Sequence, residues 1–260
     1  MLHHEISGNG KKPLVLLHGF MENTTIWNEM EAHLSKDFTL IKIDLPGHGK
    51  SKVYQEIHTV ELMAEKVKEV IDALKLEKIN LLGHSLGGYV SLAFAEKFPE
   101  ILESMTLFFS TTVADDEEKK EIRRRSIAVI DENFETFVKT SIPNLFSNNE
   151  KDILEGKIEL AKNIAKSTNK EGVKAAQLGM AERPDRTEIL ENLDAKILII
   201  AGKYDNAVKT ENLLKIIPEK TNIKTYVLDC GHNGHWEKPT ICAEIINTEL
   251  LHNLPKHFLL

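Results

Sequence analysis

The chain of 260 residues has little of what several classes of protein need. Its two cysteines, Cys230 and Cys242, are too few for a disulfide framework. It contains no run of 18 apolar residues, so we expect no membrane-spanning helix. The first residues, MLHHEISGNGKKP, are polar and lack the apolar region of a signal peptide. We therefore expect a cytoplasmic protein with no membrane partner.

Long blocks of positive charge and metal-binding motifs are also absent. The net charge is −7, and the only run of arginines, at 123–125, lies among glutamates and lysines, as is typical of a solvated helix face. We expect no nucleic-acid partner, because binding to a phosphate backbone depends on clustered positive charge. The HExxH zinc motif is missing. We therefore expect neither a metal nor a cofactor.

Short apolar runs alternate with helical patterns over most of the chain. Apolar residues recur at helical spacing over 60–74. The runs that are typical of buried parallel strands occur at 14–18, 39–43, 79–82, 104–109, 196–201 and 224–228. Strands separated by helices predict an α/β fold, with a mostly parallel sheet and helices on both of its faces.

The alternation stops between residues 111 and 192. This stretch begins with the charged sequence DDEEKKEIRRR, continues with helical spacing and contains no convincing strand pattern. We interpret 111–192 as an inserted helical cap, or lid. Residues 1–110 and 193–260 then form the core.

Residues 83–88 carry the clearest chemical motif, Gly-His-Ser-Leu-Gly-Gly, between an apolar run and a helical pattern. A G-x-S-x-G sequence in this position places the serine on a sharp strand-to-helix turn, where side chains at 83 and 87 would collide. The turn exposes the hydroxyl, and the helix N-terminus favours developing negative charge. Ser85 is therefore the predicted nucleophile rather than a structural serine.

A serine nucleophile needs a base, and the base needs an acid to orient it. On this type of elbow the chain order is serine, acid, histidine. Asp205 directly follows the run at 196–201, and His232 follows the run at 224–228. We predict that Asp205 and His232 complete a catalytic triad with Ser85.

Four nearby residues are alternatives for these roles. Asp229 lies only three residues before His232, and Asp194 precedes its strand. His235 falls at the start of a predicted helical turn, and Cys230 has no elbow around it. We therefore prefer Asp205 as the acid and His232 as the base.

An oxyanion hole needs two backbone N–H groups aimed at one point. Leu86 supplies one candidate because it directly follows the nucleophile. Phe20 supplies the other, in the sequence His18-Gly19-Phe20 after the first core strand. We expect Gly19 to allow a close backbone approach and the Phe20 side chain to line the acyl pocket.

Taken together, these motifs resemble the α/β-hydrolase fold superfamily, and in particular its small cytosolic carboxylesterases. The resemblance implies a helical lid over the site and leaves room for at most one short hairpin strand before Leu14. It is carried by HGF at 18–20, DLPGHGKS at 44–51, GHSLGG at 83–88, GKYD at 202–205 and GHNGHWEKP at 231–239.

The resemblance implies a carboxylesterase-type serine hydrolase that cleaves small soluble esters through an acyl-enzyme on Ser85, without a cofactor. We expect short acyl chains, with an optimum of about four to six carbons, because each methylene adds burial until the pocket is full.

Other members of the superfamily offer alternatives. The tail GHNGHWEKP resembles the menaquinone-pathway enzyme that eliminates pyruvate, but that family has an arginine where this chain has Tyr89. A carbon–carbon bond hydrolase and an enol-lactonase are further alternatives. A non-catalytic ligand-binding relative is another, although such proteins usually lack a triad member and none is missing here.

Overall fold

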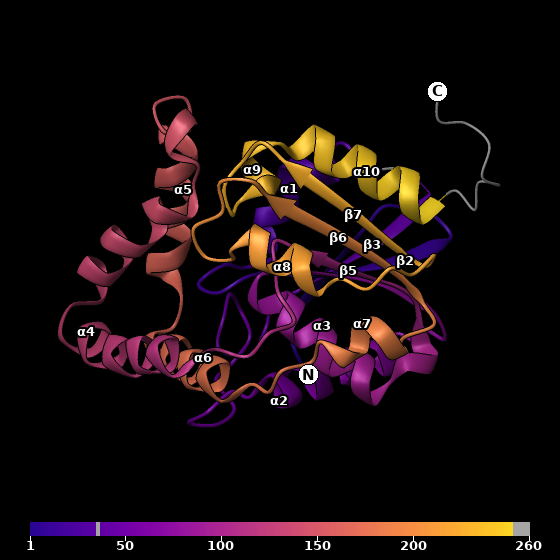
Figure 1. Cartoon of the computed structure of the whole chain (residues 1–260). Coiled ribbons are helices and arrows are strands. Elements are labelled where there is room, and N and C mark those ends of the chain that lie inside the picture. The colour runs from indigo at the N-terminus through magenta and orange to yellow at the C-terminus, as the bar shows by residue number, and fades with distance from the viewer. Residues whose placement is uncertain (35–36, 252–260) are drawn as a thin grey trace.

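The computed structural model describes residues 1–34 and 37–251. Its strands form one sheet in the order β1-β3-β2-β4-β5-β6-β7, with β1 antiparallel and the others parallel (Figure 1). The strands are β1 His4–Ser7, β2 Lys12–Leu17, β3 Phe38–Ile43, β4 Ile79–His84, β5 Leu102–Phe108, β6 Lys196–Gly202 and β7 Ile223–Leu228. The predicted α/β fold with a mostly parallel sheet is confirmed.

All six apolar runs form strands, and one further strand lies before Leu14. That strand, β1, pairs with β3 and not with β2, since His4 lies opposite Ile43. It is therefore an edge strand and not half of a hairpin with its neighbour in sequence. Every residue of the central strand β4 is buried, as expected for a parallel sheet that is covered on both faces.

Helices cover both faces of the sheet, and each layer has its own apolar core (Figure 1). One face carries α2 Val60–Ala73, α3 Leu86–Lys97, η2 Pro99–Ile101 and α8 Thr210–Ile216. The other carries η1 Thr24–Trp27, α1 Asn28–Glu31, α9 Gly234–Glu237 and α10 Pro239–Leu251. α2 buries one apolar stripe and begins at Thr59, whose hydroxyl accepts a hydrogen bond from the Leu62 N–H.

The chain between β5 and β6 is helical in the structure, with no strand among its described residues. It contains α4 Glu117–Ser141, η3 Ile142–Leu145, η4 Asn148–Glu150, α5 Glu155–Ser167, α6 Lys170–Glu182 and α7 Glu188–Asn192. α4 and α5 extend to one side of the sheet (Figure 1). α4 kinks at Asn133, whose side chain accepts a hydrogen bond from the Thr136 N–H and restarts the helix. Over the part of the chain that is described, no helix is both long and apolar enough to cross a bilayer.

Arg186 ties both ends of this helical segment to the core. Its buried guanidinium donates to Glu61 of α2 at 2.6 Å and to Glu96 of α3 at 2.8 Å. Its backbone N–H donates to the carbonyl of Thr112, at the other end of the segment, at 2.9 Å. One residue therefore joins the two ends of the segment to each other and to the core.

We expect Arg186→Met to lower the free energy of unfolding by about 2 kcal/mol, because it removes the charged hydrogen bonds of a buried guanidinium to Glu61 and Glu96. Urea denaturation followed by circular dichroism measures the change. Arg125→Met is the matched control: Arg125 is exposed, and its one ion pair among the described residues is with Glu121 on its own helix. The control should cost less than about 1 kcal/mol, and an equal loss in both variants would contradict the anchoring role.

Candidate active site

Ser85 lies on the turn that joins β4 to α3, with a φ of 49° and a ψ of −110°. A positive φ is unfavourable for a serine and costs about 1–3 kcal/mol. Two neighbouring glycines make the turn possible. A side chain at Gly83 would meet the backbone of Gly87, and one at Gly87 would meet the carbonyl of Leu17. The Ser85 N–H is fixed by the carbonyl of Phe108 at 3.0 Å.

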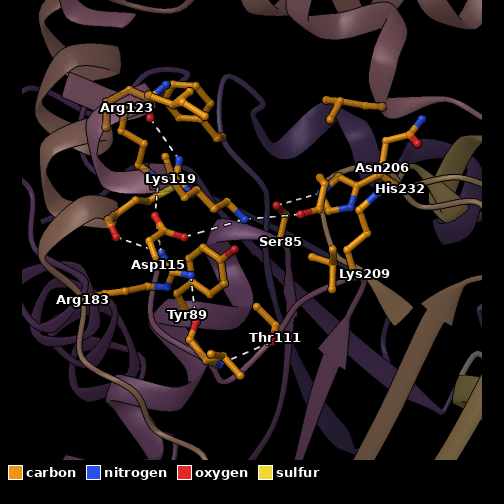
Figure 2. Close-up of a pocket in the computed structure, with 18 of the residues that line it drawn as sticks. Ser85, Tyr89, Thr111, Asp115, Lys119, Arg123, Arg183, Asn206, Lys209 and His232 are labelled. Carbon is orange, nitrogen blue, oxygen red and sulfur yellow. Dashed lines mark hydrogen bonds and ion pairs between the residues drawn. The ribbon is translucent and has the colours of Figure 1, made fainter. Parts of the chain in front are cut away.

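The structure brings Ser85, His232 and Asp205 into one hydrogen-bonded chain. His232 Nε2 lies 2.8 Å from Ser85 Oγ (Figure 2). His232 Nδ1 lies 2.7 Å from Asp205 Oδ2. The other oxygen of Asp205 accepts the backbone N–H groups of Ala207 at 2.7 Å and Val208 at 2.8 Å, which fixes the carboxylate. A neutral imidazole with its proton on Nδ1 satisfies both contacts and leaves Nε2 free to accept the serine proton.

The alternative residues lie elsewhere or have no suitable partner. Asp229 is 74% exposed and pairs with Lys203, and Asp194 is exposed before β6, away from the carboxyl ends of the strands. His235 is buried, and neither of its ring nitrogens has a hydrogen-bond partner among the described residues. Burial raises the pKa of the Cys230 thiol, which keeps it protonated and a poor nucleophile.

The two expected oxyanion-hole residues follow neighbouring strands. Leu86 is the first residue of α3, so its N–H has no acceptor within the helix. Phe20 follows β2, which pairs directly with β4, and its side chain lines the cavity at Ser85. Met21 has a φ of 59°, which turns the chain sharply after Phe20. Both N–H groups therefore lie at the same edge of the sheet as Ser85.

A buried pair behind the triad, Glu22 and His84, was missed by the sequence analysis. Glu22 Oε2 accepts the Gly19 N–H at 2.5 Å and lies 2.8 Å from His84 Nδ1. His84 Nε2 lies 3.0 Å from the backbone carbonyl of His232. Both ring nitrogens of His84 face acceptors, so both carry protons and the ring is an imidazolium.

The charges of this pair stabilise each other. Burial alone would raise the pKa of Glu22, but the charge and hydrogen bond of His84 lower it to about 2. Burial alone would lower the pKa of His84, but Glu22 outweighs this and raises it. Burial and the charge of His84 hold the pKa of nearby His235 well below its usual value, so that ring is neutral. The pair thereby joins the Gly19 loop, the serine turn and the His232 loop.

Glu22, His84 and His235 are also the described residues whose ligand atoms lie close enough together to hold a metal ion, within 4.8 Å of one another. Two histidines and a carboxylate are a ligand set that zinc accepts. Here, however, His84 donates to Glu22 and to the His232 carbonyl. A metal ion on His84 Nδ1 would have to displace the proton that holds this pair together.

The loop that carries His232 is bonded to the helical segment between β5 and β6. The His232 N–H donates to the carbonyl of Leu145, in η3, at 2.8 Å. The buried carboxylate of Glu237 accepts the Gly231 N–H at 2.8 Å and the Ser147 N–H at 3.1 Å. Two independent connections therefore hold this loop against η3 and the residues after it.

A cavity of about 690 Å³ contains Ser85 and His232. The core contributes the apolar side chains of Phe20, Tyr89, Val208 and Leu213, and the helical segment contributes Phe137, Leu145 and Met180. This volume is in the range of small-molecule sites. The arrangement places a serine hydroxyl in contact with an imidazole next to a partly apolar cavity, a geometry in which the imidazole can accept the serine proton.

Comparisons with known proteins agree with this geometry. Residues 12–239 match the model of the alpha/beta hydrolase fold family, so the chain belongs to that family and is an α/β-fold hydrolase. A thermophilic esterase from Thermogutta terrifontis, solved with malate bound, is 33% identical with a TM-score of 0.89, and the match covers 96% of this chain and 93% of that chain.

Curated relatives point to more than one reaction. A putative 2-succinyl-6-hydroxy-2,4-cyclohexadiene-1-carboxylate synthase of Bacillus subtilis is 28% identical over 92% of this chain and 90% of its own length. A 2-hydroxy-6-oxononadienedioate/2-hydroxy-6-oxononatrienedioate hydrolase of Escherichia coli is 27% identical over 91% of this chain and 86% of its own length. An uncharacterised protein of Mycobacterium tuberculosis is 35% identical over 43% of this chain, and the match spans 32% of that protein's length.

We expect Asp205→Asn to lower kcat by a factor on the order of 10⁴, because an amide does not hold the histidine in the required tautomer. Steady-state hydrolysis of an activated ester measures the effect. Asp229→Asn is the matched control, since Asp229 is exposed and paired with a surface lysine. The control should retain its activity. A large loss of kcat in Asp229→Asn, with little change in Asp205→Asn, would show that Asp229 is the acid that orients His232.

We expect Glu22→Gln to cost about 3–5 kcal/mol of folding stability near pH 6. The lowered pKa of Glu22 gives stability above its ordinary value of 4.5, which is lost as the pH falls toward about 2. The raised pKa of His84 gives stability that is complete below 6.5 and is lost as the pH rises through the folded pKa. The cost should therefore shrink at alkaline pH, as measured by urea denaturation between about pH 5 and 9.

Glu31→Gln is the control for this pH dependence. Glu31 also forms an ion pair, with Lys42 at 2.8 Å, but a lysine ordinarily keeps its charge over this range. Its cost should stay constant from about pH 6 to 9. A pH-independent cost for Glu22→Gln would show that His84 is not an imidazolium.

Proposed function

We propose that this protein is a carboxylesterase-type serine hydrolase that cleaves esters of small, soluble molecules through an acyl-enzyme on Ser85. The observation that carries the proposal is the chain of short contacts from Asp205 through His232 to Ser85, at 2.7 and 2.8 Å, which ends in the cavity. The likeness to the Thermogutta terrifontis esterase supports it. A cytoplasmic location belongs to the same proposal.

Acylation starts at the serine. His232 Nε2 takes the proton of Ser85 as Oγ attacks the ester carbonyl, and Asp205 stabilises the imidazolium that forms. The Phe20 and Leu86 N–H groups hold the negative oxygen of the tetrahedral intermediate. The bond to the alcohol oxygen then breaks, and His232 gives its proton to the departing alcohol.

Deacylation repeats the sequence with water. His232 removes a proton from water as the water attacks the acyl carbonyl, and the same two N–H groups hold the second oxyanion. The bond to Ser85 Oγ breaks, Ser85 recovers its proton from His232, and the carboxylic acid leaves. Only side chains and backbone groups of this chain take part, so the proposal includes no cofactor and no metal.

The size of the cavity favours short acyl chains. The helical segment covers it with Phe137 and Leu145, which limits the space beyond Ser85. Each methylene that fits gains about 0.8 kcal/mol of burial. Rates should rise with chain length until the cavity is full and then fall, with the optimum at about four to six carbons.

Cleavage of a carbon–carbon bond, or elimination of the synthase type, is the second candidate. It is favoured by the Bacillus subtilis and Escherichia coli relatives, which match over nine-tenths of this chain. Tyr89, at the position where the synthase family has an arginine, favours the esterase.

The test is kcat/KM for p-nitrophenyl esters with acyl chains from C2 to C16, for the natural chain and for Ser85→Ala. We expect Ser85→Ala to lower kcat by at least about 10⁴-fold with little change in melting temperature, because the role of the serine is chemical. Ser141→Ala is the control, since Ser141 lines the same cavity outside the hydrogen-bonded chain. Full activity in Ser85→Ala would end the assignment, an optimum at C12 or beyond would end the short-chain proposal, and negligible rates throughout would favour the second candidate.

A further inference from the structure

Three cationic side chains surround one buried carboxylate in the wall of the catalytic cavity (Figure 2). Asp115 Oδ2 accepts Arg123 Nε at 2.5 Å and lies 2.9 Å from Arg183 Nη1. Its other oxygen, Oδ1, has no hydrogen-bond partner among the described residues and lies 3.7 Å from Lys119 Nζ. One negative charge therefore faces three positive ones.

Both arginines make further contacts that hold this cluster together. Arg183 donates to the carbonyls of Met180 at 2.8 Å and Val113 at 2.9 Å, and its guanidinium lies 3.9 Å from the centre of the Tyr89 ring. Arg123 donates to Gln177 at 3.0 Å as well as to Asp115. Burial alone would raise the pKa of Asp115, but Arg183 and Arg123 lower it to about 2, so it is a carboxylate.

Lys119 is different, because its ammonium group has only long contacts with the residues that the structure describes. It extends from α4 toward Ser85 and lies 3.4 Å from the carbonyl of Ala207 and 3.7 Å from Asp115 Oδ1 (Figure 2). Both distances exceed those of a good N–H···O hydrogen bond, 2.7–3.2 Å. Ala207 belongs to the loop that orients the triad acid, since its N–H donates to Asp205. The free positive charge therefore lies between α4 and the catalytic loops.

The other acidic side chains that line the cavity do not neutralise this charge. Glu22 is bonded to His84, and the carboxylate of Asp116 accepts the backbone N–H of Lys119 at 2.8 Å as the cap of α4. Glu118 is exposed and adjacent to Lys119 in sequence, and the side chains of adjacent helical residues do not face each other. With Asp115 balanced by the arginines, the ammonium group of Lys119 is available to an anion from solution.

We propose that Lys119 binds a carboxylate of the substrate, so that the preferred esters carry a free carboxylate in addition to the ester that is cleaved. A single ammonium is a point charge with three donors, which suits a monoanionic group. Bidentate recognition of a phosphate would require the guanidinium groups, and these are already bonded to Asp115. This inference rests on the proposed function of Ser85 and names its substrate class.

The experiment compares kcat/KM for matched pairs of esters. The first set pairs the monomethyl esters of succinic, glutaric and adipic acids with the methyl esters of butyric, valeric and hexanoic acids. The second set places the carboxylate on the alcohol side and pairs O-acetyl glycolate with ethyl acetate. Proton release at constant pH measures both sets, for the natural chain and for Lys119→Met, Lys119→Arg and Lys120→Met.

We expect the natural chain to prefer the acidic member in at least one set. Lys119→Met should lower the ratio of acidic to neutral kcat/KM by about 10- to 100-fold, the effect of one charged hydrogen bond. Lys119→Arg should restore much of that ratio. Lys120→Met is the matched control, because Lys120 is the next residue of α4 and pairs with Glu117 at 2.8 Å. It should leave both the ratio and the activity unchanged.

The outcomes separate this inference from the function on which it rests. A natural chain that prefers neutral esters in both sets, or a Lys119→Met ratio equal to that of the natural chain, overturns the carboxylate site. If no ester is cleaved, the esterase proposal fails. Calorimetry with glutarate then decides whether Lys119 binds a carboxylate. Glutarate that binds to the natural chain but not to Lys119→Met supports the carboxylate site. Glutarate that binds to neither protein, or equally to both, overturns the carboxylate site.

Discussion

The backbone turn at Ser85 determines how the rest of the site is arranged. A serine with a positive φ is unfavourable unless its surroundings fix it, and here β4, α3, the Phe108 carbonyl and two glycines all do so. The turn directs the hydroxyl to the edge of the sheet at which the parallel strands end. The loops that follow β2, β6 and β7 begin at the same edge. His232, Asp205 and the expected oxyanion donors therefore converge there.

A buried ion pair holds these loops together from behind. Glu22 and His84 lie between the Gly19 loop, the serine turn and the His232 loop, and the proton on each nitrogen of His84 has an acceptor. Neutral His235 next to them avoids a second buried charge. Removing one member of such a pair leaves an unpaired charge in the interior, so both members are needed to hold the three loops together.

The sequence was sufficient for the fold and for the convergence of Ser85, Asp205 and His232, because strand order and motif order constrain both. Their catalytic roles, the oxyanion hole and the division into core and cap at 111–192 stay predictions. Glu22 and His84 escaped notice because they are 62 residues apart, and nothing local signals that they meet. Lys119 was interpreted as part of a solvated charged face. Only the path of α4 shows that part of that face, including Lys119 and Arg123, lines the cavity.

The hydrogen bond from the His232 N–H to the carbonyl of Leu145 has a kinetic consequence. His232, the proposed base, is bonded to a residue of η3 that lines the cavity, so a displacement of η3 would also move the imidazole. Under the proposed function, a substrate too bulky for the cavity would then lose turnover as well as affinity, and selection by size would act on the chemical step itself.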